Sequence, residues 1–362
     1  DAGIFGRRGM FHDYMAQFRA GEFREKLIKL FCILNTRPED RDPYEDEQLL
    51  AFPYVNGGMF AGDIEIPRIN EEIRDLILQR ASDDFDWSLI SPTIFGAVFE
   101  STLNPATRRA GGMHYTSIEN IHKVIDPLFL NDLKAELADI KATSVAKTKK
   151  DRAYAFQDKI SKLKFFDPAC GSGSLLIRAA NEAPFPLAIY GQEKDISTAG
   201  LAKMNVVLHN IPSGEIHSDN TFSDPWYKDD NDDTKLRKFD YIVANPPFSM
   251  KNWMDGLKPY GRFDDYDELP PEKNGDYAWL LHIIKSMKNN TGKAAVILPH
   301  GVLFRGNAEE SIRKNIIDRH LIKGIIGLPA NLFYGTGIPA CIIVLDKENT
   351  ASRTGIFMID AS

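Results

Sequence analysis

Four residues in the second half of the chain have the types and order of a site that activates an amine. Asn245, Pro246, Pro247 and Phe248 follow an apolar run at 241–244. The prolines remove backbone donors and stiffen the turn. The Asn245 amide oxygen and the Pro246 carbonyl can then accept both hydrogens of an exocyclic amine, and Phe248 can stack on a base swung out of a duplex. The pattern predicts methyl transfer to an amino nitrogen, with a plain proline turn as the alternative.

A glycine-rich turn earlier in the chain is a candidate cofactor site. Gly171 and Gly173 follow an apolar run and let the backbone turn sharply and approach a ligand closely. Amides at the start of the following helix favour negative charge. Asp167 suits a ligand with a positive amino group, such as the methionine part of S-adenosylmethionine, although it could be a helix cap. We expect Pro168 and Ser172 to line the same site.

The next predicted strand ends in a carboxylate. Glu193 lies twenty residues after Gly173. An acidic residue at this point accepts hydrogen bonds from both ribose hydroxyls of a nucleotide-type cofactor. Asp195 competes for the role, and we prefer Glu193.

A third predicted strand, near 215–217, ends at Asp219. Asp219, with Asn220 beside it, is placed to accept from the adenine amino group of the cofactor. Phe222 could pack on the same ring or belong to the core, and both interpretations stay open.

The elements that must position these residues begin at residue 163. Short apolar runs there alternate with helical stretches, which predicts an α/β fold with a doubly wound, mostly parallel sheet. Ligands in such sheets lie beyond the carboxyl ends of the strands. Besides the third strand, the predicted strands are 163–166, 188–190, 241–244, 294–298, 322–327, 341–345 and 355–360.

Residues 1–162 are predicted to form a mainly helical domain, and residues 163–362 the catalytic domain. In the first, Ile73, Leu76 and Ile77 follow helical spacing and predict a helix with one apolar face. Residues 116–119 have the form of a capping box. The helix that they open carries isoleucines along one side, at 118, 121 and 125, and one long polar connector helix follows over 131–162.

Composition limits the possible functions. At 43% hydrophobic and 26% charged residues, the chain has the make-up of a soluble protein, with no apolar run near the ~20 residues of a membrane span. It begins at Asp1 without a methionine, which suggests a truncated N-terminus. The net charge of −7 disfavours a protein that grips DNA over its whole surface, so a nucleic-acid contact must be local or shared with a basic partner.

Neither cysteine nor histidine shows metal-ligand spacing. Cys32, Cys170 and Cys341 lie far apart, which fits a reducing cytoplasmic setting. The eight histidines form no zinc-type pair, so we predict no metal. The acidic run at 229–233 lacks the glycine and closing glutamate of a calcium loop, and we interpret it as a solvated loop.

The two motifs together resemble a known family. Asp-Pro-Ala-Cys-Gly-Ser-Gly at 167–173 followed by Asn-Pro-Pro-Phe at 245–248 is similar to S-adenosylmethionine-dependent DNA adenine-N6 methyltransferases. Residues 163–362 resemble the modification subunit of type I restriction-modification systems, with matching stretches at 190–195, 199–205 and 332–340. The resemblance implies a Rossmann-like class I methyltransferase fold, S-adenosylmethionine as cofactor and 245–248 as the catalytic residues, Asn245 also touching the cofactor.

The first part resembles another branch of the family. Residues 1–135 are similar to single-chain enzymes that fuse nuclease, methyltransferase and recognition domains, on the stretches 90–96 and 112–117. In both branches a Tyr-Thr segment touches the cofactor. The resemblance therefore implies cofactor contacts from Met113, His114, Tyr115, Thr116 and Ser117.

The resemblance also implies partners. No target-recognition domain follows the last predicted strand at 355–360. We therefore expect double-stranded DNA with a flipped adenine as substrate and a separate specificity subunit. A restriction nuclease subunit is a further expected partner, with two methyltransferase chains per complex.

Rival functions remain at this point. Enzymes that methylate amines in ribosomal RNA or glutamine amides in proteins use a related Asn-Pro-Pro turn, although the long helical first part and Phe248 favour DNA. A non-catalytic scaffold would not need Asn245, Pro246 and Phe248, and a dinucleotide oxidoreductase would not explain them.

The loop 249–276 carries aromatic and basic residues that would suit a nucleic-acid strand, or that could stabilise a surface loop. These residues are Trp253, Tyr260, Phe263, Tyr266, Lys251, Lys258 and Arg262.

Overall fold

The structure is a computed structural model, and it describes residues 5, 7–55, 60, 65–91, 94–96, 118–211, 213–330, 332 and 337–361. The chain forms two compact units. The first comprises Asp1–Phe95 with Lys203–Pro212, and the second comprises Gly96–Ala202 with Ser213–Ser362. The division at residues 95 and 96 lies earlier than the change of sequence pattern at 162 and 163.

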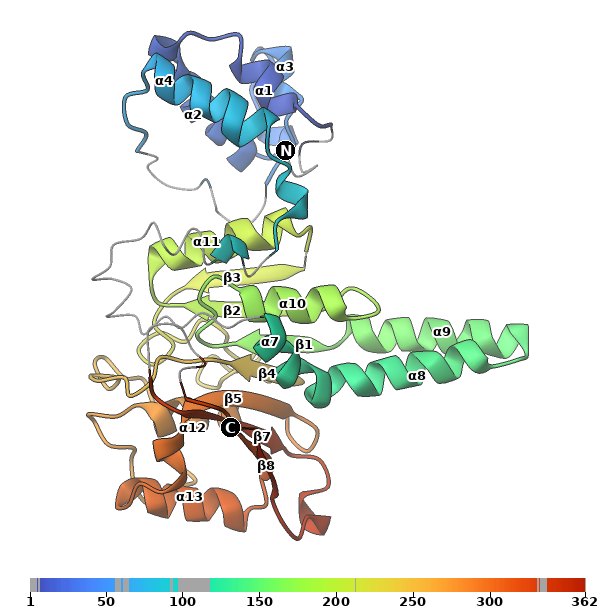
Figure 1. Cartoon of the computed structure of the whole chain (residues 1–362), viewed down its shortest axis with the longest axis vertical. Coiled ribbons are helices and arrows are strands. Elements are labelled where there is room, and N and C mark those ends of the chain that lie inside the picture. Colours follow the sequence, from blue (N-terminus) through green and yellow to red (C-terminus); the bar gives the residue numbers. More distant parts are fainter. Residues whose placement is uncertain are drawn as a thin grey trace. The chain divides into compact units, whose positions relative to one another are not determined.

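The second unit is built on a sheet whose described strands run in the order β3-β2-β1-β4-β5-β7-β6-β8 (Figure 1). Strand β7 is antiparallel to β5 and β6, and the other described pairs are parallel. The predicted doubly wound, mostly parallel sheet is confirmed. Its strands are β1 (Lys164–Asp167), β2 (Ala188–Glu193), β3 (Gly214–Ser218), β4 (Tyr241–Ala244), β5 (Lys293–Pro299), β6 (Ile322–Gly327), β7 (Ala340–Asp346) and β8 (Phe357–Asp360).

Strand β1 shows why the sheet is covered on both faces. Phe165 and Phe166 are buried neighbours, and successive side chains of a strand point to opposite faces. Phe165 contacts Phe129 edge-on, with 4.5 Å between ring centroids. Phe166 stacks on Phe239 at 4.3 Å, within the cluster that includes residues of α12 and α13. An apolar run buried on both faces is typical of a central parallel strand.

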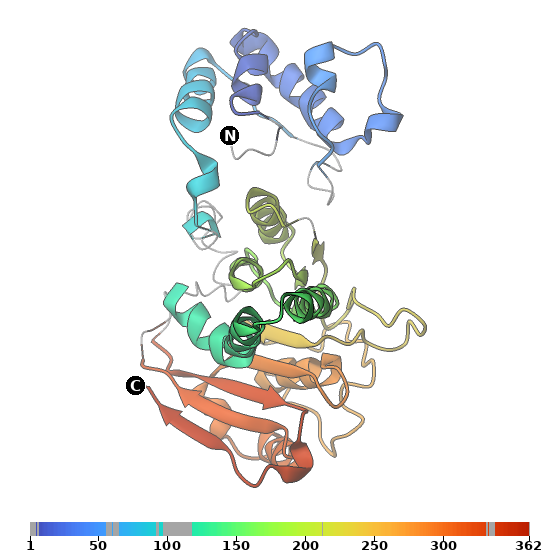
Figure 2. The ribbon, with the colours of Figure 1, turned by 90° about the vertical axis from the view of Figure 1, so that its right-hand side faces the viewer.

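Helices therefore pack on each side of the sheet (Figure 2). One face carries α7 (Ile118–Ile125), η4 (Asp126–Leu130) and α10 (Ser174–Glu182), and the other carries α12 (Asp276–Ser286) and α13 (Ala308–Asp318). Ile121 and Ile125 of α7 are buried, as the spacing predicts. The remaining described helices of this unit are η5 (His300–Leu303), η6 (Thr350–Ser352) and the first half of α11 (Ile196–Leu208), whose residues from Lys203 onward belong to the first unit.

The predicted single connector helix over 131–162 is wrong. Two helices, α8 (Asn131–Ala142) and α9 (Ala146–Ser161), form a hairpin that projects from one end of the sheet (Figure 1). The chain leaves helical geometry at Thr143 and Val145, which are extended. Surface ion pairs such as Arg152–Asp139 link the two helices, and each contributes about 0–1 kcal/mol.

The first unit is helical, as predicted. Four residues spaced along α2 face its core: Phe23, Leu27, Leu30 and Leu34. Apolar residues at this spacing form a single stripe along the helix, which packs against the neighbouring helices. The described elements are α1 (Met10–Met15), α2 (Ala20–Asn35), η1 (Pro38–Asp40), α3 (Glu47–Leu50), α4 (Glu71–Asp75), η2 (Leu76–Asp83) and η3 (Trp87–Leu89).

The predicted apolar face of the 70–77 helix is wrong in part. Asn70 caps α4 by accepting from the backbone N–H of Ile73 at 2.8 Å. However, Ile73 and Leu76 are 40% and 52% exposed, whereas Leu78 is buried. The wider π-helix η2 begins at Leu76 and shifts the buried stripe. None of the helices described in either unit has the length and apolar composition needed to cross a membrane.

Candidate functional site

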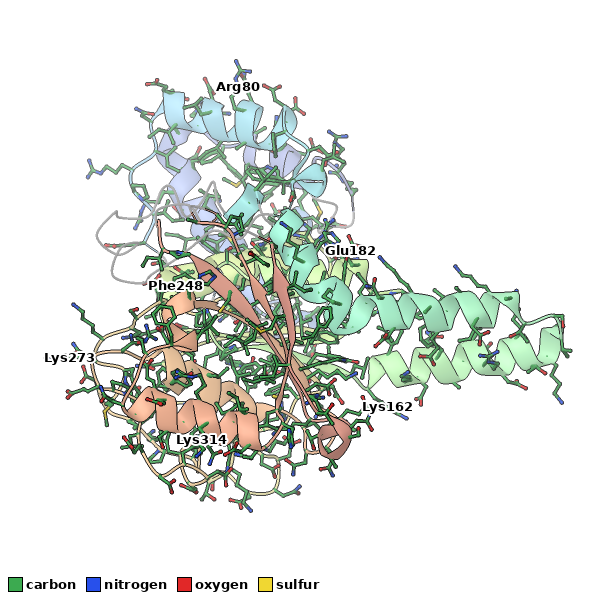
Figure 3. The ribbon with its side chains drawn as sticks, turned by 60° about the horizontal axis from the view of Figure 1, so that its bottom comes forward. Arg80, Lys162, Glu182, Phe248, Lys273 and Lys314 are labelled. Atoms are coloured by element: carbon green, nitrogen blue, oxygen red, sulfur yellow. The ribbon has the colours of Figure 1, made fainter. Side chains whose placement is uncertain are left out.

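Four predicted site segments lie at one edge of the sheet. Asp167 ends β1, Glu193 ends β2, Asp219 follows β3 and Asn245 follows β4. These strands are parallel neighbours in the order β3-β2-β1-β4, so their carboxyl ends meet at the same edge. Figure 3 shows Phe248 at this edge, on the side opposite the end of α9.

The turn after β1 has the backbone that its glycines predict. Gly171 and Gly173 have φ angles of +52° and +77°, in the left-handed region that favours glycine. A Cβ on Gly173 would lie 3.4 Å from Ile177 Cδ1 and 3.5 Å from Ala202 Cβ. A Cβ on Gly171 would meet no atom of the described residues within 4 Å. The turn is therefore in van der Waals contact with its neighbours at Gly173, whereas the described residues leave open space beside Gly171.

Glu193 is joined to this turn. Its Oε2 accepts the backbone N–H of Gly171 at 3.0 Å, and its Oε1 accepts that of Asp195 at 3.0 Å. Burial raises the pKa of Glu193, and these two N–H donors oppose the rise. The competitor Asp195 accepts from both the backbone N–H and the hydroxyl of Thr198, each at 2.8 Å, in the manner of a helix cap. This structural role leaves Glu193 as the candidate.

Asp167 is buried at the end of β1, only 2% exposed. One carboxyl oxygen accepts the N–H of Ala169 at 2.9 Å. Helix α10 has Gly173 as its N-cap residue, so Asp167 is not that cap. Burial raises the pKa of Asp167 to about 8; the N–H of Ala169 opposes the rise and the nearby Glu193 charge adds to it. A carboxylate in this position is stabilised by a cationic ligand.

The segment after β3 is held by a residue that the sequence reasoning missed. Gln192, 1% exposed, donates to the backbone carbonyl of Asp219 at 3.1 Å. Asp219 donates its N–H to the Glu193 carbonyl at 3.0 Å, and Asn220 Oδ1 accepts from Phe222 at 2.9 Å. Burial raises the pKa of Asp219. In the sequence, the signal that could have indicated the role of Gln192 is its polar amide side chain within the mostly buried strand β2.

The open question about Phe222 is answered in favour of the core. Phe222 is fully buried, with its ring 4.5 Å from that of Trp279 and the Arg262 guanidinium 5.6 Å from its centroid. Arg262 is also buried, and it donates to the carbonyls of Thr221 and Phe222.

The aromatic residues of the loop 249–276 mostly stabilise the loop itself. Trp253 and Phe263 are buried, and Trp253 donates to the Pro271 carbonyl at 2.9 Å. Lys251 and Lys258 are exposed. The surface-loop interpretation therefore holds for the buried members.

The candidate catalytic loop follows the buried strand β4 directly. Pro246 is buried, and Asn245, Pro247 and Phe248 are half-buried. The next residue, Ser249, has a positive φ of 51° and donates its N–H to a carboxylate of α12 at 2.7 Å. The loop is thus bounded by the sheet on one side and by the start of α12 on the other.

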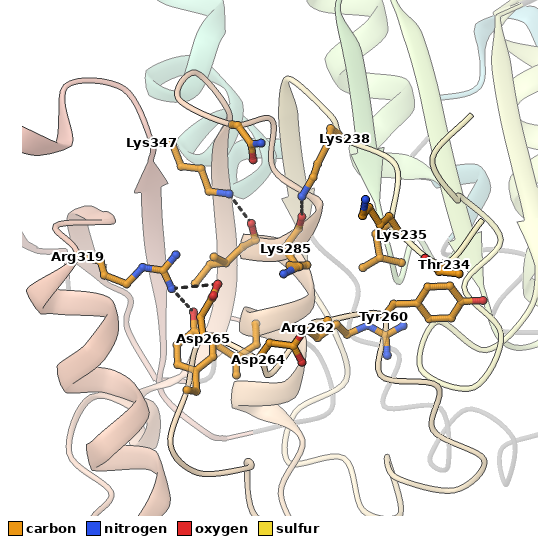
Figure 4. Close-up of a pocket in the computed structure, with 16 residues that line it drawn as sticks. Thr234, Lys235, Lys238, Tyr260, Arg262, Asp264, Asp265, Lys285, Arg319 and Lys347 are labelled. Carbon is orange, nitrogen blue, oxygen red and sulfur yellow. Dashed lines mark hydrogen bonds and ion pairs between the residues drawn. The ribbon is translucent and has the colours of Figure 1, made fainter. Parts of the chain in front are cut away.

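A cavity of about 490 Å³ lies elsewhere, around the last turn of α12 (Figure 4). Lys347 donates to the carbonyls of Ile284 and Met287, and Lys238 donates to that of Lys285. These bonds satisfy carbonyls that the helix end leaves without partners. Burial, with nearby cations adding, lowers the pKa of Lys347 to about 8. Helix capping accounts for these lysines, and we assign no ligand to the cavity.

Met113, His114, Tyr115, Thr116 and Ser117 lie outside the described residues. Their predicted cofactor contacts stay predictions. The acidic run at 229–233 lies in a partly exposed turn, where Asp232 pairs with Lys235 and Asp230 with Arg237.

Comparison with known proteins identifies the family of this chain. The family model for N-6 DNA methylase matches residues 92–362, and that for the helicase spacer domain of MmeI matches residues 1–60. Two type I restriction enzyme methylase subunits of Methanocaldococcus jannaschii, MjaIX and MjaVIII, are 31% and 33% identical. The aligned residues cover 70% and 76% of this chain but only 41% and 44% of those proteins.

Two solved structures share the fold. The type IIL restriction-modification enzyme MmeI, in complex with DNA, has a TM-score of 0.68 at 24% identity, over 94% of this chain and 51% of that one. The type I methyltransferase subunit of Streptococcus thermophilus has a TM-score of 0.50 at 23% identity, over 99% and 87%. The Rossmann-like class I methyltransferase fold is confirmed, and both type I methylase subunits and MmeI are among the proteins that this chain resembles. The chain belongs to the N-6 DNA methylase family.

Proposed function

We propose that this chain transfers the methyl group of S-adenosylmethionine to the exocyclic N6 of adenine in DNA, as the modification part of a restriction-modification system. One observation carries the proposal. The segment Asn245-Pro246-Pro247-Phe248 leaves β4, the strand that pairs with β1, and β1 ends in the turn of Asp167 and Gly173. A methyl donor and an amine acceptor would therefore meet between adjacent strand ends.

The residues at the edge of the sheet fit S-adenosylmethionine. Open space beside Gly171 can admit a ligand close to the backbone. Asp167 would hold the positive amino group, Glu193 the ribose hydroxyls and Asp219 the adenine amino group. Carboxylate oxygens can accept further bonds besides those from Gly171 and Asp195, because each oxygen has two lone pairs. When bound, the cofactor supplies an electrophilic methyl group on a sulfonium.

The catalytic loop would act on the acceptor amine. The Asn245 amide oxygen and the Pro246 carbonyl accept the two hydrogens of the adenine amino group, which draws electron density onto its nitrogen. The rigid prolines hold these acceptors before the base arrives, so little reorganisation is needed in the transition state. Phe248 stacks on the base, which reaches the site only after it leaves the duplex.

Recognition of DNA would be shared with other subunits. The type I relatives are named methylase subunits, and this chain spans less than half of their length. Its charge of −7 leaves little electrostatic affinity for a polyanion without a basic partner. We therefore propose a separate specificity subunit, two methyltransferase chains per complex and association with a restriction nuclease subunit. The three free cysteines suit the cytoplasm as the place of action.

Calorimetric titration with S-adenosylmethionine tests the proposal first, with NAD as the control. Binding of S-adenosylmethionine alone supports the methyltransferase pocket, whereas binding of NAD would favour an oxidoreductase and binding of neither a scaffold. Transfer of tritiated methyl to DNA or to ribosomal RNA, with a specificity subunit present, then distinguishes the acceptors. Preference for RNA would contradict the proposal.

A further inference from the structure

A buried carboxylate holds the end of the candidate catalytic loop. Asp276 is the first residue of α12 and is 0% exposed. Its Oδ1 accepts the backbone N–H of Ser249 at 2.7 Å, and its Oδ2 accepts from Arg305 Nη2 at 2.6 Å. Ser249 directly follows Phe248. The carboxylate therefore acts on the backbone beside the proposed base-stacking ring.

The backbone that Asp276 holds is strained. Ser249 has a φ of 51°, a left-handed conformation that is unfavourable for a non-glycine residue. A second bond supports it, because Gly275 donates its N–H to the Met250 carbonyl at 2.9 Å. A Cβ on Gly275 would lie only 3.3 Å from that carbonyl oxygen. The start of α12 thus fixes two consecutive residues after Phe248.

The Asp276 carboxylate is itself held by a residue of the segment between η5 and α13. Arg305 lies in the segment that follows β5 and η5, and its Nε donates to Glu309 Oε2 at 2.5 Å. Glu309, in the first turn of α13, is 2% exposed. Two donor nitrogens of Arg305, Nε and Nη2, therefore face two different buried carboxylates. The chain of contacts Ser249–Asp276–Arg305–Glu309 links the loop after β4 to the segment after β5.

Stability alone is a weak reason for such a network. Burying ionised groups costs solvation energy. A protein with well-packed apolar groups of similar volume in their place is often equally stable. A buried ion pair does fix orientation, since planar guanidinium and carboxylate groups meet in few geometries. A catalytic loop that must keep two acceptors aimed at an amine benefits from a fixed orientation.

We infer that Asp276 is a positioning residue, which holds the Ser249 backbone so that Phe248 and Asn245 keep the orientation that an extrahelical base requires. Arg305 and Glu309 hold the Asp276 carboxylate in place. The inference rests on the proposed function of Asn245 and Phe248.

The test compares Asp276→Asn with Asp318→Asn in the full chain. The amide in Asp276→Asn keeps the shape but directs its N–H₂ at either Ser249 or Arg305, so one donor loses its acceptor. We expect at least tenfold faster hydrogen exchange in the peptide covering 245–253, unchanged affinity for S-adenosylmethionine, and kcat lower by about 10- to 100-fold with the specificity subunit. Asp318 is exposed at the end of α13, so Asp318→Asn should leave the exchange rate, the cofactor affinity and kcat at their wild-type values.

A second variant, Arg305→Lys, keeps the charge but cannot bridge Asp276 and Glu309 with separate guanidinium donors. If Asp276→Asn does not fold, Arg305→Lys is measured in its place. Its kcat should also be lower than that of the wild type. Wild-type exchange and kcat in Asp276→Asn overturn the inference, and so does a loss of cofactor affinity equal to the loss of kcat. Asn245→Ala separates the two hypotheses: normal transfer in that variant refutes the proposed function, while the exchange measurement still reports on Asp276.

Discussion

Gly171 donates its backbone N–H to Glu193 Oε2 at 3.0 Å, so the turn after β1 and the end of β2 form one connected unit. Two residues that the sequence assigns to different parts of one cofactor are thus in direct contact with each other. A change at either should disturb binding at both.

Gly173→Val should abolish cofactor binding. The residue has a φ of +77°, a conformation that strains any L side chain, and the methyl groups of valine extend beyond a Cβ that already lies 3.4 Å from Ile177 Cδ1. Calorimetry should detect no binding at concentrations that saturate the wild type. The matched control is Gly200→Ala, where a Cβ meets nothing within 4 Å and affinity should stay unchanged. Wild-type affinity in Gly173→Val would show that the turn is misassigned.

Glu193 and Asp195 should separate into a binding and a structural role. Glu193→Gln loses a charged acceptor for the ribose, which should weaken S-adenosylmethionine binding by about 10- to 100-fold. Asp195→Ala loses the bonds to Thr198, which should lower the free energy of unfolding by about 0.5–2 kcal/mol and leave affinity within about twofold. Calorimetry and thermal melts measure the two effects. The reverse pattern would exchange the assignments.

Affinity for S-adenosylmethionine should rise with pH. Burial raises the pKa of Asp167 to about 8, so without a cationic partner the carboxyl group is mostly the neutral acid at pH 7. A positive amino group binds the ionised form, so binding releases a proton, and affinity should increase by up to about tenfold per pH unit below 8 and then level off.

Titrations in phosphate and Tris at pH 7 measure the released proton from the difference in heat. Asp167→Asn should bind more weakly and lose this dependence. A flat profile in the wild type would contradict the contact between Asp167 and the amino group.

Phe129→Ala should destabilise the sheet unit. Phe129 is fully buried, with its ring 4.5 Å from that of Phe165 and 5.3 Å from that of Tyr241. Removing it should lower the free energy of unfolding by about 3–5 kcal/mol. Phe304→Ala, at a residue 75% exposed, should change it by less than about 0.5 kcal/mol. Equal melting temperatures for the two variants would show that Phe129 of η4 does not contribute to the core.

The strand pattern was predictable most directly for the central strands of the sheet, which are buried. Phe165 and Phe166 in β1, and the residues from Ile242 to Ala244 in β4, are consecutive buried apolar residues, and such runs mark central parallel strands. The order of the strands beyond β5 was not predictable, because the pairing of β7 with both β5 and β6 depends on contacts between residues that are distant in the sequence. The break at Thr143 was missed because β-branched and hydroxyl residues are only mildly unfavourable within a helix.

The candidate site was predictable where one segment carries the whole signal. Gly171, Gly173 and Asn245 lie in short motifs with a local mechanism. Asp276 was not predictable, because its contact with Ser249 spans 27 residues and uses the backbone of its partner. A carboxylate at the start of a helix is ordinary in sequence.

The central claim is methyl transfer to adenine N6 at Asn245. The most direct measurement is nucleoside mass spectrometry of unmethylated DNA after incubation with the chain, S-adenosylmethionine and a specificity subunit. Wild-type protein should produce N6-methyldeoxyadenosine, and Asn245→Ala should bind the cofactor normally yet produce at least about a hundredfold less. Methylated cytosine in place of adenine, or undiminished N6-methyldeoxyadenosine from Asn245→Ala, would contradict the claim.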